Sequence, residues 1–327
     1  MKTLEKKLKK IRSGKYKATD FIIADAKDAD MGFGVAAPGP TTDANEGENG
    51  WKSREQYLEA MTELVNSRLI DITLMSASSA EILQRRGVFR KSKVTPAIRM
   101  NDTTDIWMAR GGVYRQFASE AFASADLEAA VPYANLGLYS ITFCNDLHID
   151  KANLDAYKAF RLAARKAGMR HFLEVFNPPI DIGIKAEDMG FYINDMIVKA
   201  LAGVTEADAP LFLKLQFNGS KAMEELSHYD PLRLVPGILG GASGTTRDTF
   251  ELVFQAHQAG ARVALFGRKI NLSESPLELV SLMRQVVTQA LSPTDAVRAY
   301  HEQLKSQGIS PQRSLRQDLR VTDQSLK

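Results

Sequence analysis

"LVPGILGGASGTTRDTFELVFQAHQAGARVALFG", residues 234–267, contains one full unit of the pattern that sets the fold. It opens with a short apolar run that predicts a strand, passes through a glycine-rich turn and ends with a second run, "RVALFG". Between the runs, Thr245 and Asp248 have the spacing of a capping box, and Phe250 and Val253 recur at helical spacing. The stretch therefore predicts a strand–turn–helix–strand unit.

The same alternation recurs along the chain from residue 18. Eight β-rich runs read "DFIIADAK", "LIDITLMS", "VTPAIRM", "LGLYSITFC", "RHFLEVF", "LFLKLQF", "LVPGIL" and "RVALFG". Helical patterns lie between and after them, near 53–67, 78–86, 117–134, 151–168, 190–203, 219–228, 245–259 and 276–290. Eight strand–helix units predict an α/β protein of the (β/α)8 TIM barrel type. A doubly wound open sheet is the alternative, but the segment after the first strand lacks the GxGxxG spacing of dinucleotide binders.

Three regions follow from this pattern. Residues 1–17 are basic, with leucine and isoleucine at helical spacing, and predict an N-terminal helix that closes the bottom of the barrel. We expect residues 18–290 to form the (β/α)8 barrel, the main domain of the chain, with any functional site in it. Residues 291–327 form a C-terminal helix followed by a polar tail, 307–327, which we expect to be mobile.

Composition narrows the functional classes. A formal net charge of +3 on 327 residues gives no case for binding nucleic acid or a membrane surface. The single cysteine, Cys144, cannot form an intramolecular disulfide, which fits a reducing cytoplasm. No apolar run reaches the roughly 20 residues of a membrane span. The five histidines are scattered without HxxxH spacing, so we expect no metal site.

Two long loops leave the carboxyl ends of predicted strands, where barrel active sites are built. Residues 30–52 follow the first strand and are rich in Gly, Pro, Thr and Asn, and residues 101–116 follow the third. Either loop could act as a lid or mediate subunit contacts, and the sequence leaves both possibilities open.

The sixth predicted strand places a lysine within an apolar run. Because side chains alternate along a strand, Leu211, Leu213 and Leu215 share the face that packs on helices, whereas Lys214 and Gln216 point into the barrel. The same reasoning places Glu174 of the fifth strand and Arg99 of the third inside, and puts Asp25 and Lys27 together on one face of the first strand.

A lysine inside a barrel has a chemical use. Its neutral amine can attack a ketone and form an iminium, which acts as an electron sink when a carbon–carbon bond is made or broken. The structural alternative is a buried ion pair of Lys214 with Glu174 or Asp25 that does no chemistry.

Glycine-rich turns after the seventh and eighth strands are a second signal. Barrels often bind phosphate there through backbone N–H groups, and Gly240, Gly241 and Gly267 would allow close approach while Arg268 adds charge. The alternative is that these glycines only make tight turns.

This combination resembles the class I aldolases of the archaeal-type fructose-bisphosphate aldolase and deoxyribose-phosphate aldolase superfamily. "KLQFNGS" looks like the segment around their Schiff-base lysine, and "GGASGTTRDTFELVFQAHQAGARVALFGRKI" looks like their paired-glycine turn, helix and Gly-Arg turn. The chain departs from the family at "FLEVFNPP", where fructose-bisphosphate members commonly have a tyrosine, and at "DAKDADMGFG", which replaces the usual Asp-His-Gly.

The resemblance implies a Schiff-base aldolase, a carbon–carbon lyase acting on a phosphorylated ketose, with fructose 1,6-bisphosphate or a related sugar phosphate as the expected substrate. Lys214 would form the imine, Glu174 or Asp25 would be the acid/base, and Lys27 and Arg99 would disfavour the protonated amine or bind a second phosphate. The glycine turns and Arg268 would hold the first phosphate.

The resemblance also implies a cytoplasmic homo-oligomer of carbohydrate metabolism, in glycolysis, with no metal and no separate cofactor. Two rival functions remain. One is a phosphosugar isomerase or epimerase in which Glu174 is the base and Lys214 an electrostatic partner. The other is a non-catalytic barrel that binds phosphosugar.

Overall fold

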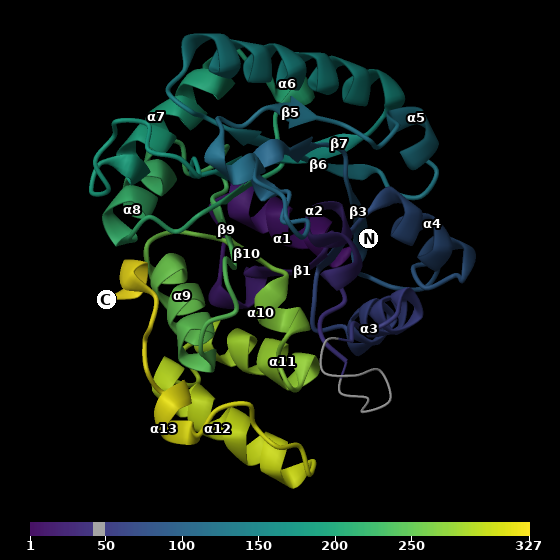
Figure 1. The fold of residues 1–327 in the computed structure, drawn as a ribbon, viewed down its shortest axis with the longest axis vertical. Coiled ribbons are helices and arrows are strands. Elements are labelled where there is room, and N and C mark those ends of the chain that lie inside the picture. The colour runs from purple at the N-terminus through teal and green to yellow at the C-terminus, as the bar shows by residue number, and fades with distance from the viewer. Residues whose placement is uncertain (42–49) are drawn as a thin grey trace.

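The computed structural model describes residues 1–41 and 50–327. Within these residues, eight parallel strands close a barrel in the order β1, β2, β3, β6, β7, β8, β9, β10 and back to β1 (Figure 1). The predicted (β/α)8 barrel and each of its eight predicted strands are therefore confirmed. The barrel strands are β1 (Ile22–Lys27), β2 (Ile72–Met75), β3 (Thr95–Arg99), β6 (Leu136–Thr142), β7 (Arg170–Phe176), β8 (Leu213–Leu215), β9 (Gly237–Leu239) and β10 (Val263–Phe266).

Helices surround the barrel as an outer layer (Figure 1). The predicted helical ranges coincide to within four residues with α3 (Arg54–Ser67), α4 (Ala77–Arg85), α6 (Leu147–Ala167), α7 (Met189–Ala202), α8 (Ser220–Tyr229), α9 (Thr246–Gln258) and α11 (Pro276–Val287). The capping box predicted at Thr245 is present, because its hydroxyl accepts from the Asp248 N–H and the Asp248 carboxylate accepts from the Thr245 N–H.

The helix predicted over 117–134 is wrong. The segment begins as irregular chain and pairs β5 (Ala121–Phe122) antiparallel with β4 (Asp102–Thr103). A side chain from another part of the chain also holds its backbone, because the Ala121 N–H donates to Asn153 Oδ1 at 2.9 Å. Only α5 (Leu127–Ala130) is helical, and it begins where the Asp126 side chain caps its first turn. Tertiary contacts thus override the local helical pattern.

The N-terminal helix closes one end of the barrel, as predicted. Leu4, Leu8 and Ile11 of α1 (Thr3–Arg12) are buried against the residues that begin the strands. Each such side chain contributes about 1.5–3 kcal/mol when fully buried. Inside the barrel, the rings of Phe172 and Phe212 stack with centroids 4.5 Å apart. The end of the barrel where the strands begin is therefore filled by packed apolar side chains.

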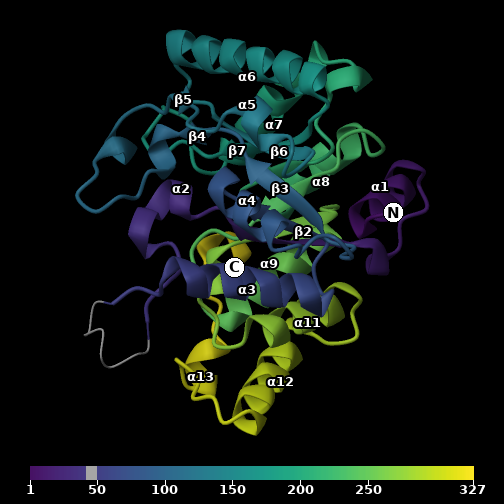
Figure 2. The same ribbon diagram turned by 90° about the vertical axis from the view of Figure 1, so that its right-hand side faces the viewer.

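The opposite end carries the long loops (Figure 2). The loop after β1 contains α2 (Asp30–Phe33), and the loop after β3 contains the short helix η4 (Thr104–Ile106). The two loops meet where the Met108 N–H donates to the Gly32 carbonyl at 2.8 Å. Part of the first predicted loop, residues 42–49, lies outside the described residues, and a lid role for either loop stays a prediction.

The C-terminal residues fold back onto α9. After α12 (Pro293–Ser306) the chain forms α13 (Leu315–Asp318) and η7 (Gln324–Leu326). The Asp318 carboxylate accepts from the Thr246 N–H at 2.7 Å, and Asp248 accepts from the Thr322 N–H at 2.7 Å. Leu326 is buried. These contacts do not favour the mobility expected from the polar composition of this tail. None of the described helices has the length and apolar character needed to cross a membrane.

Candidate active site

A cavity of about 150 Å³ opens at the carboxyl ends of the strands. It brings together residues from six barrel strands or the segments that follow them, although these are far apart in sequence. Of the residues that the sequence analysis selected, the following line it: Arg99, Glu174, Lys214, Gly240, Gly241, Gly267 and Arg268. The cavity therefore joins the predicted lysine site to both predicted glycine turns.

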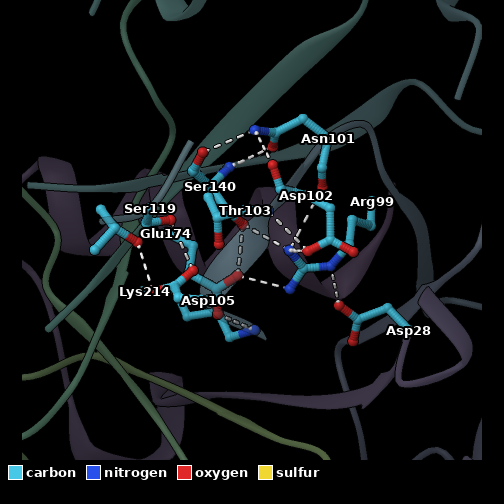
Figure 3. Close-up of polar contacts among 11 residues, drawn as sticks. Asp28, Arg99, Asn101, Asp102, Thr103, Asp105, Ser119, Ser140, Glu174 and Lys214 are labelled. Carbon is cyan, nitrogen blue, oxygen red and sulfur yellow. Dashed lines mark hydrogen bonds and ion pairs between the residues drawn. The ribbon is translucent and has the colours of Figure 1, made fainter. Parts of the chain in front are cut away.

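Lys214 and Glu174 are direct partners across neighbouring strands. Their Cα atoms are paired in the β7–β8 register, and Lys214 Nζ lies 2.5 Å from Glu174 Oε1 (Figure 3). Lys214 is 5% exposed and Glu174 is 1% exposed. An isolated ammonium would be costly at this depth, and the carboxylate offsets that cost. The ion pair predicted as the structural alternative is thus present, and it lies within the cavity.

Arg99 connects Glu174 to a second carboxylate. Its Nη2 lies 2.7 Å from Glu174 Oε2, and its Nε lies 2.5 Å from Asp28 Oδ2 (Figure 3). Burial raises the pKa of Asp28, but the charges of Arg99 and Lys214 outweigh it, and the pKa falls below its usual value. Burial lowers the pKa of Arg99, but the carboxylates outweigh it, and the guanidinium stays charged. Asp28 is therefore held ionised at the cavity.

Ser140 fixes the side chain of Glu174 from the other side. Ser140, Glu174 and Lys214 occupy one row across β6, β7 and β8. The Ser140 hydroxyl donates to Glu174 Oε2 at 2.7 Å, and Arg99 Nη1 lies 2.7 Å from the Ser140 Oγ. The backbone of Ser140 is itself paired with the Asn101 amide. These contacts orient the free edge of Glu174 toward Lys214.

Asp102 lies beneath this network and is the least satisfied of its carboxylates. Its Oδ1 is 3.8 Å from Arg99 Nη1, and its Oδ2 is buried without a hydrogen-bond partner among the described residues. Burial raises the pKa of Asp102 to about 7. With Asp102 protonated, the carboxylates of Asp28 and Glu174 balance the cations of Arg99 and Lys214.

The two glycine turns form the wall of the cavity beside Lys214. A Cβ at Gly267 would meet the Ala26 carbonyl oxygen at 2.6 Å, so only glycine allows β10 to turn this close to β1. Gly241 has a φ of 63° and open space around its Cα, which leaves its backbone accessible. Burial and the charge of Arg115 lower the pKa of Arg268, and no carboxylate of the described chain lies within ion-pair distance of it. The turns thus combine accessible backbone with uncompensated positive charge.

An adjoining hollow of about 290 Å³ extends the mouth. It is lined in part by Asn177 and Gln216, which directly follow the fifth and sixth barrel strands, and by Arg115 of the loop after β3. Asp323 and Ser325 of the C-terminal segment complete its edge. The hollow is therefore continuous with the glycine turns, since Gly240 and Gly241 line both spaces.

Asp25 and Lys27 do not reach the cavity. They pair with each other at 2.6 Å, and both are buried. Lys27 is opposite Met75 in the β1–β2 register and shares the face of Ile23, which packs against the helical layer. Alternation did group the two residues correctly, but on the outer face of β1. The structure offers neither of them to a substrate in this cavity.

Sequence reasoning missed Asp28, Ser140 and Asp102. A usable signal existed for the first two, because Asp28 continues the inward alternation of Ala24 and Ala26, and Ser140 continues that of Leu138. Asp102 carries no such signal, since its position depends on the β4–β5 pairing. In residues 1–41 and 50–327, no group of three His, Cys, Asp or Glu side chains is arranged to hold a metal ion.

No protein-family model matches the chain, and no curated protein matches its sequence. Solved structures do match. An archaeal fructose 1,6-bisphosphate aldolase superposes with a TM-score of 0.62 and 16% identity, covering 88% of this chain and 99% of that one.

Two further aldolase structures agree. The fructose-bisphosphate aldolase from Slackia heliotrinireducens has a TM-score of 0.63 and 12% identity, covering 92% of this chain and 90% of its own. An archaeal fructose-1,6-bisphosphate aldolase whose catalytic lysine is covalently bound to the carbinolamine intermediate has a TM-score of 0.61 and 15% identity, covering 87% and 99%. The chain has the (β/α)8 barrel fold of the archaeal fructose 1,6-bisphosphate aldolases.

Proposed function

We propose that this protein is a Schiff-base-forming aldolase that cleaves a phosphorylated ketose. The observation that carries the proposal is the position of Lys214 Nζ, 2.5 Å from a carboxylate and in the same cavity as both glycine turns. One of the matching aldolases was solved with its catalytic lysine bound to a carbinolamine, which is the intermediate expected here at Lys214.

Imine formation begins with a proton transfer. Glu174 accepts a proton from the Lys214 ammonium, and the neutral amine then attacks the ketone carbon of the substrate. The carbonyl oxygen takes up the proton that Glu174 holds and becomes the hydroxyl of a carbinolamine. The attacking nitrogen then gives its extra proton to Glu174. Protonated again, this hydroxyl leaves as water, and the nitrogen lone pair forms the iminium. We assign these proton transfers to Glu174, because its Oε1 lies 2.5 Å from Lys214 Nζ.

Cleavage uses the iminium as an electron sink. A base removes the proton from the hydroxyl on the carbon two positions from the iminium carbon. The carbon–carbon bond between that carbon and its neighbour then breaks. The electron pair of this bond forms the enamine, and the fragment with the former hydroxyl leaves as an aldehyde. Glu174 is the residue we assign to this step and to the later protonation of the enamine. Arg99 and Ser140 hold Glu174 Oε2, so its other oxygen stays directed to the reacting atoms.

The substrate phosphate is assigned to the glycine turns. Gly240, Gly241 and Gly267 offer backbone close to Lys214, and Arg268 supplies a charge without a carboxylate partner. Fructose 1,6-bisphosphate is the first substrate to test, because the three solved structures described above are fructose-bisphosphate aldolases. A cytoplasmic, homo-oligomeric enzyme of glycolysis that needs no metal remains part of this proposal.

The experiment is reductive trapping. The full chain is incubated with dihydroxyacetone phosphate, reduced with borohydride and digested with a protease. The masses of the peptides are then measured by mass spectrometry. We expect an adduct on Lys214 that is lost in Lys214→Met and kept in Lys221→Met, a matched control at an exposed lysine of α8. A folded protein that gives no adduct with any ketose phosphate would overturn the proposal.

The short Lys214–Glu174 ion pair also favours a second candidate, a phosphosugar isomerase or epimerase. There Glu174 would abstract a proton next to the carbonyl, and the Lys214 ammonium would stabilise the enediolate. That enzyme interconverts isomers without any borohydride-trapped adduct, so the same experiment separates the two.

A further inference from the structure

A second cavity lies behind the two glycine turns, and we call it the rear cavity. Its volume is about 540 Å³, and its lining includes Ser243, Gly244, Thr246, Thr249, Lys269 and Arg313. No lining residue is common to the rear cavity and the catalytic cavity. The same two turns nevertheless serve both, since Gly241 and Arg268 face the catalytic cavity whereas Ser243 and Lys269 face the rear one.

Lys269 in the rear cavity is a buried lysine without a counter-ion. It is 4% exposed, and its Nζ donates to the Ser243 carbonyl at 3.2 Å. The other deeply buried lysines differ, because Lys27 and Lys214 each have a carboxylate oxygen within 2.6 Å. Across residues 1–41 and 50–327, no acidic group lies within ion-pair distance of Lys269. An ammonium has three N–H donors, so donor capacity remains toward the cavity.

Nearby carboxylates do not act as a counter-ion for Lys269. Asp248 and Asp323 act on Lys269 through space, but burial outweighs them and lowers its pKa to about 8. The Asp248 carboxylate is already engaged, because it accepts from the N–H groups of Thr245 and Thr322. Within residues 1–41 and 50–327, the positive charge at the rear cavity is therefore largely uncompensated.

The rest of the lining suits an oxyanion. Lys52 and Arg313 add positive charge at its rim, and the threonines and serines supply hydroxyl donors. Glu274 is the acid among the lining residues, and its oxygens already accept from the Gln312 N–H and the Tyr300 hydroxyl. Among the described residues, the lining thus carries three cations and one acid, and that acid is hydrogen-bonded elsewhere.

We propose that the rear cavity is a second ligand site, which binds a small phosphate-bearing anion on Lys269, separately from the catalytic cavity. The anion would supply the counter-charge that Lys269 lacks, with Arg313 and the hydroxyl groups completing its contacts. Because Ser243 and Lys269 follow directly on the turns that carry Gly241 and Arg268, a ligand here bears on the geometry of the catalytic cavity. This inference does not depend on the aldolase reaction.

The test is a binding measurement on the full chain with inorganic phosphate, by isothermal titration. The wild type is compared with Lys269→Met, which changes the rear cavity, and with Arg268→Met, which changes the catalytic one. We expect Lys269→Met to weaken one class of phosphate site at least tenfold, and Arg268→Met to leave that class intact. Parallel titrations with glycerol 3-phosphate and pyrophosphate distinguish a preference for the free ion from one for an ester.

Folding of the variant is checked by thermal unfolding. Lys269→Met replaces a buried, unpaired charge with an apolar chain of similar length, so its Tm without phosphate should equal or exceed that of the wild type. Phosphate should raise the Tm of the wild type and of Arg268→Met but leave that of Lys269→Met less changed. Equal phosphate affinity in the wild type and Lys269→Met, or loss of all binding in Arg268→Met alone, would overturn the proposal, as would no saturable binding to the wild type.

Discussion

Glu174 and Lys214 are cross-strand partners whose charged atoms lie 2.5 Å apart at the carboxyl end of the barrel. The two oxygens of Glu174 have different partners, because Oε1 meets Lys214 while Oε2 meets Arg99 and Ser140. Glu174 therefore keeps two of its three contacts when Lys214 becomes an imine. A carboxylate placed in this way can exchange protons with the lysine without changing its own orientation.

Glu174→Gln separates imine formation from bond cleavage. The amide keeps the shape of the side chain but cannot accept a proton, so water must take the proton from the Lys214 ammonium in place of Glu174. Borohydride trapping of dihydroxyacetone phosphate on Lys214 should therefore be slower than in the wild type but should survive. Turnover of the ketose phosphate should fall by about 10²–10⁴. Coupled assay of the aldehyde product measures the second quantity.

The control for this variant is Glu5→Gln, which removes a carboxylate paired with Arg170 at the far end of the barrel. It should leave both trapping and turnover unchanged. Unchanged turnover in Glu174→Gln would remove Glu174 from the acid/base role.

Gly267→Ala tests how close β10 must lie to β1. The new Cβ would meet the Ala26 carbonyl oxygen at 2.6 Å, and backbone must move to accept it. We expect a loss of about 1–3 kcal/mol in unfolding free energy and a fall of roughly 10–100-fold in kcat/KM, since the turn beside Lys214 shifts. Urea unfolding and steady-state kinetics check the two effects.

Gly203→Ala is the matched control, because both glycines have negative φ and the Cβ at Gly203 meets nothing within 4 Å. Its stability and kinetics should stay near those of the wild type. Should Gly267→Ala behave in the same way, the turn is not under steric constraint.

Asp102→Asn tests the protonation of the buried network. Asp102 has an ordinary pKa of 3.8, and burial raises it to about 7 in the folded chain. The folded chain therefore binds more protons than the unfolded chain between about pH 4 and pH 7, so Asp102 lowers the stability progressively as the pH rises through this window. Each unit of pKa shift corresponds to about 1.4 kcal/mol.

Asn has no proton to lose, so the stability of Asp102→Asn relative to wild type should rise by a few kcal/mol, at about 1.4 kcal/mol per unit, between pH 4 and pH 7. Urea unfolding of both proteins across this range measures the difference. A constant difference would mean that Asp102 is ionised throughout.

Asp318→Ala tests the docking of the C-terminal segment. Its carboxylate accepts from the Thr246 N–H in the first turn of α9 and also pairs with His301 at 2.9 Å. Removing it leaves the helix N-terminus without this acceptor and should cost about 1–2 kcal/mol in urea unfolding. Asp155→Ala, which removes an exposed pair with Lys151, is the comparison and should change the stability little.

The barrel was predictable because its signals are local and repeated. Alternation, with the leucine face of the sixth strand taken as the outer one, placed Lys214, Glu174 and Arg99 inside. The glycine turns named another part of the cavity wall. Alternation gives only the pairing of faces, however, and not which face is inner. Asp25 and Lys27 were therefore grouped correctly and expected at the site, although they lie on the outer face of β1. Asp28 on the inner face was overlooked.

Long-range contacts account for the other differences. The segment 117–134 has a helical pattern, yet β4 and the Asn153 side chain hold part of it extended. The polar tail contains few apolar residues, and its attachment depends on the carboxylates of Asp248 and Asp318 meeting the start of α9. No window of sequence short enough for periodicity arguments contains both partners of such contacts.

The docked C-terminal segment has a consequence for the order of synthesis. The first turn of α9 receives its acceptor from Asp318, which the ribosome adds only after all eight barrel strands have been made. Domains fold as they emerge, beginning from the N-terminus. The barrel can thus close by pairing β1 with β10 before the C-terminal segment contacts the start of α9, which follows the turn carrying Gly241. Newly made chains would pass through a closed but unfinished form, and the site would mature as the final event of folding.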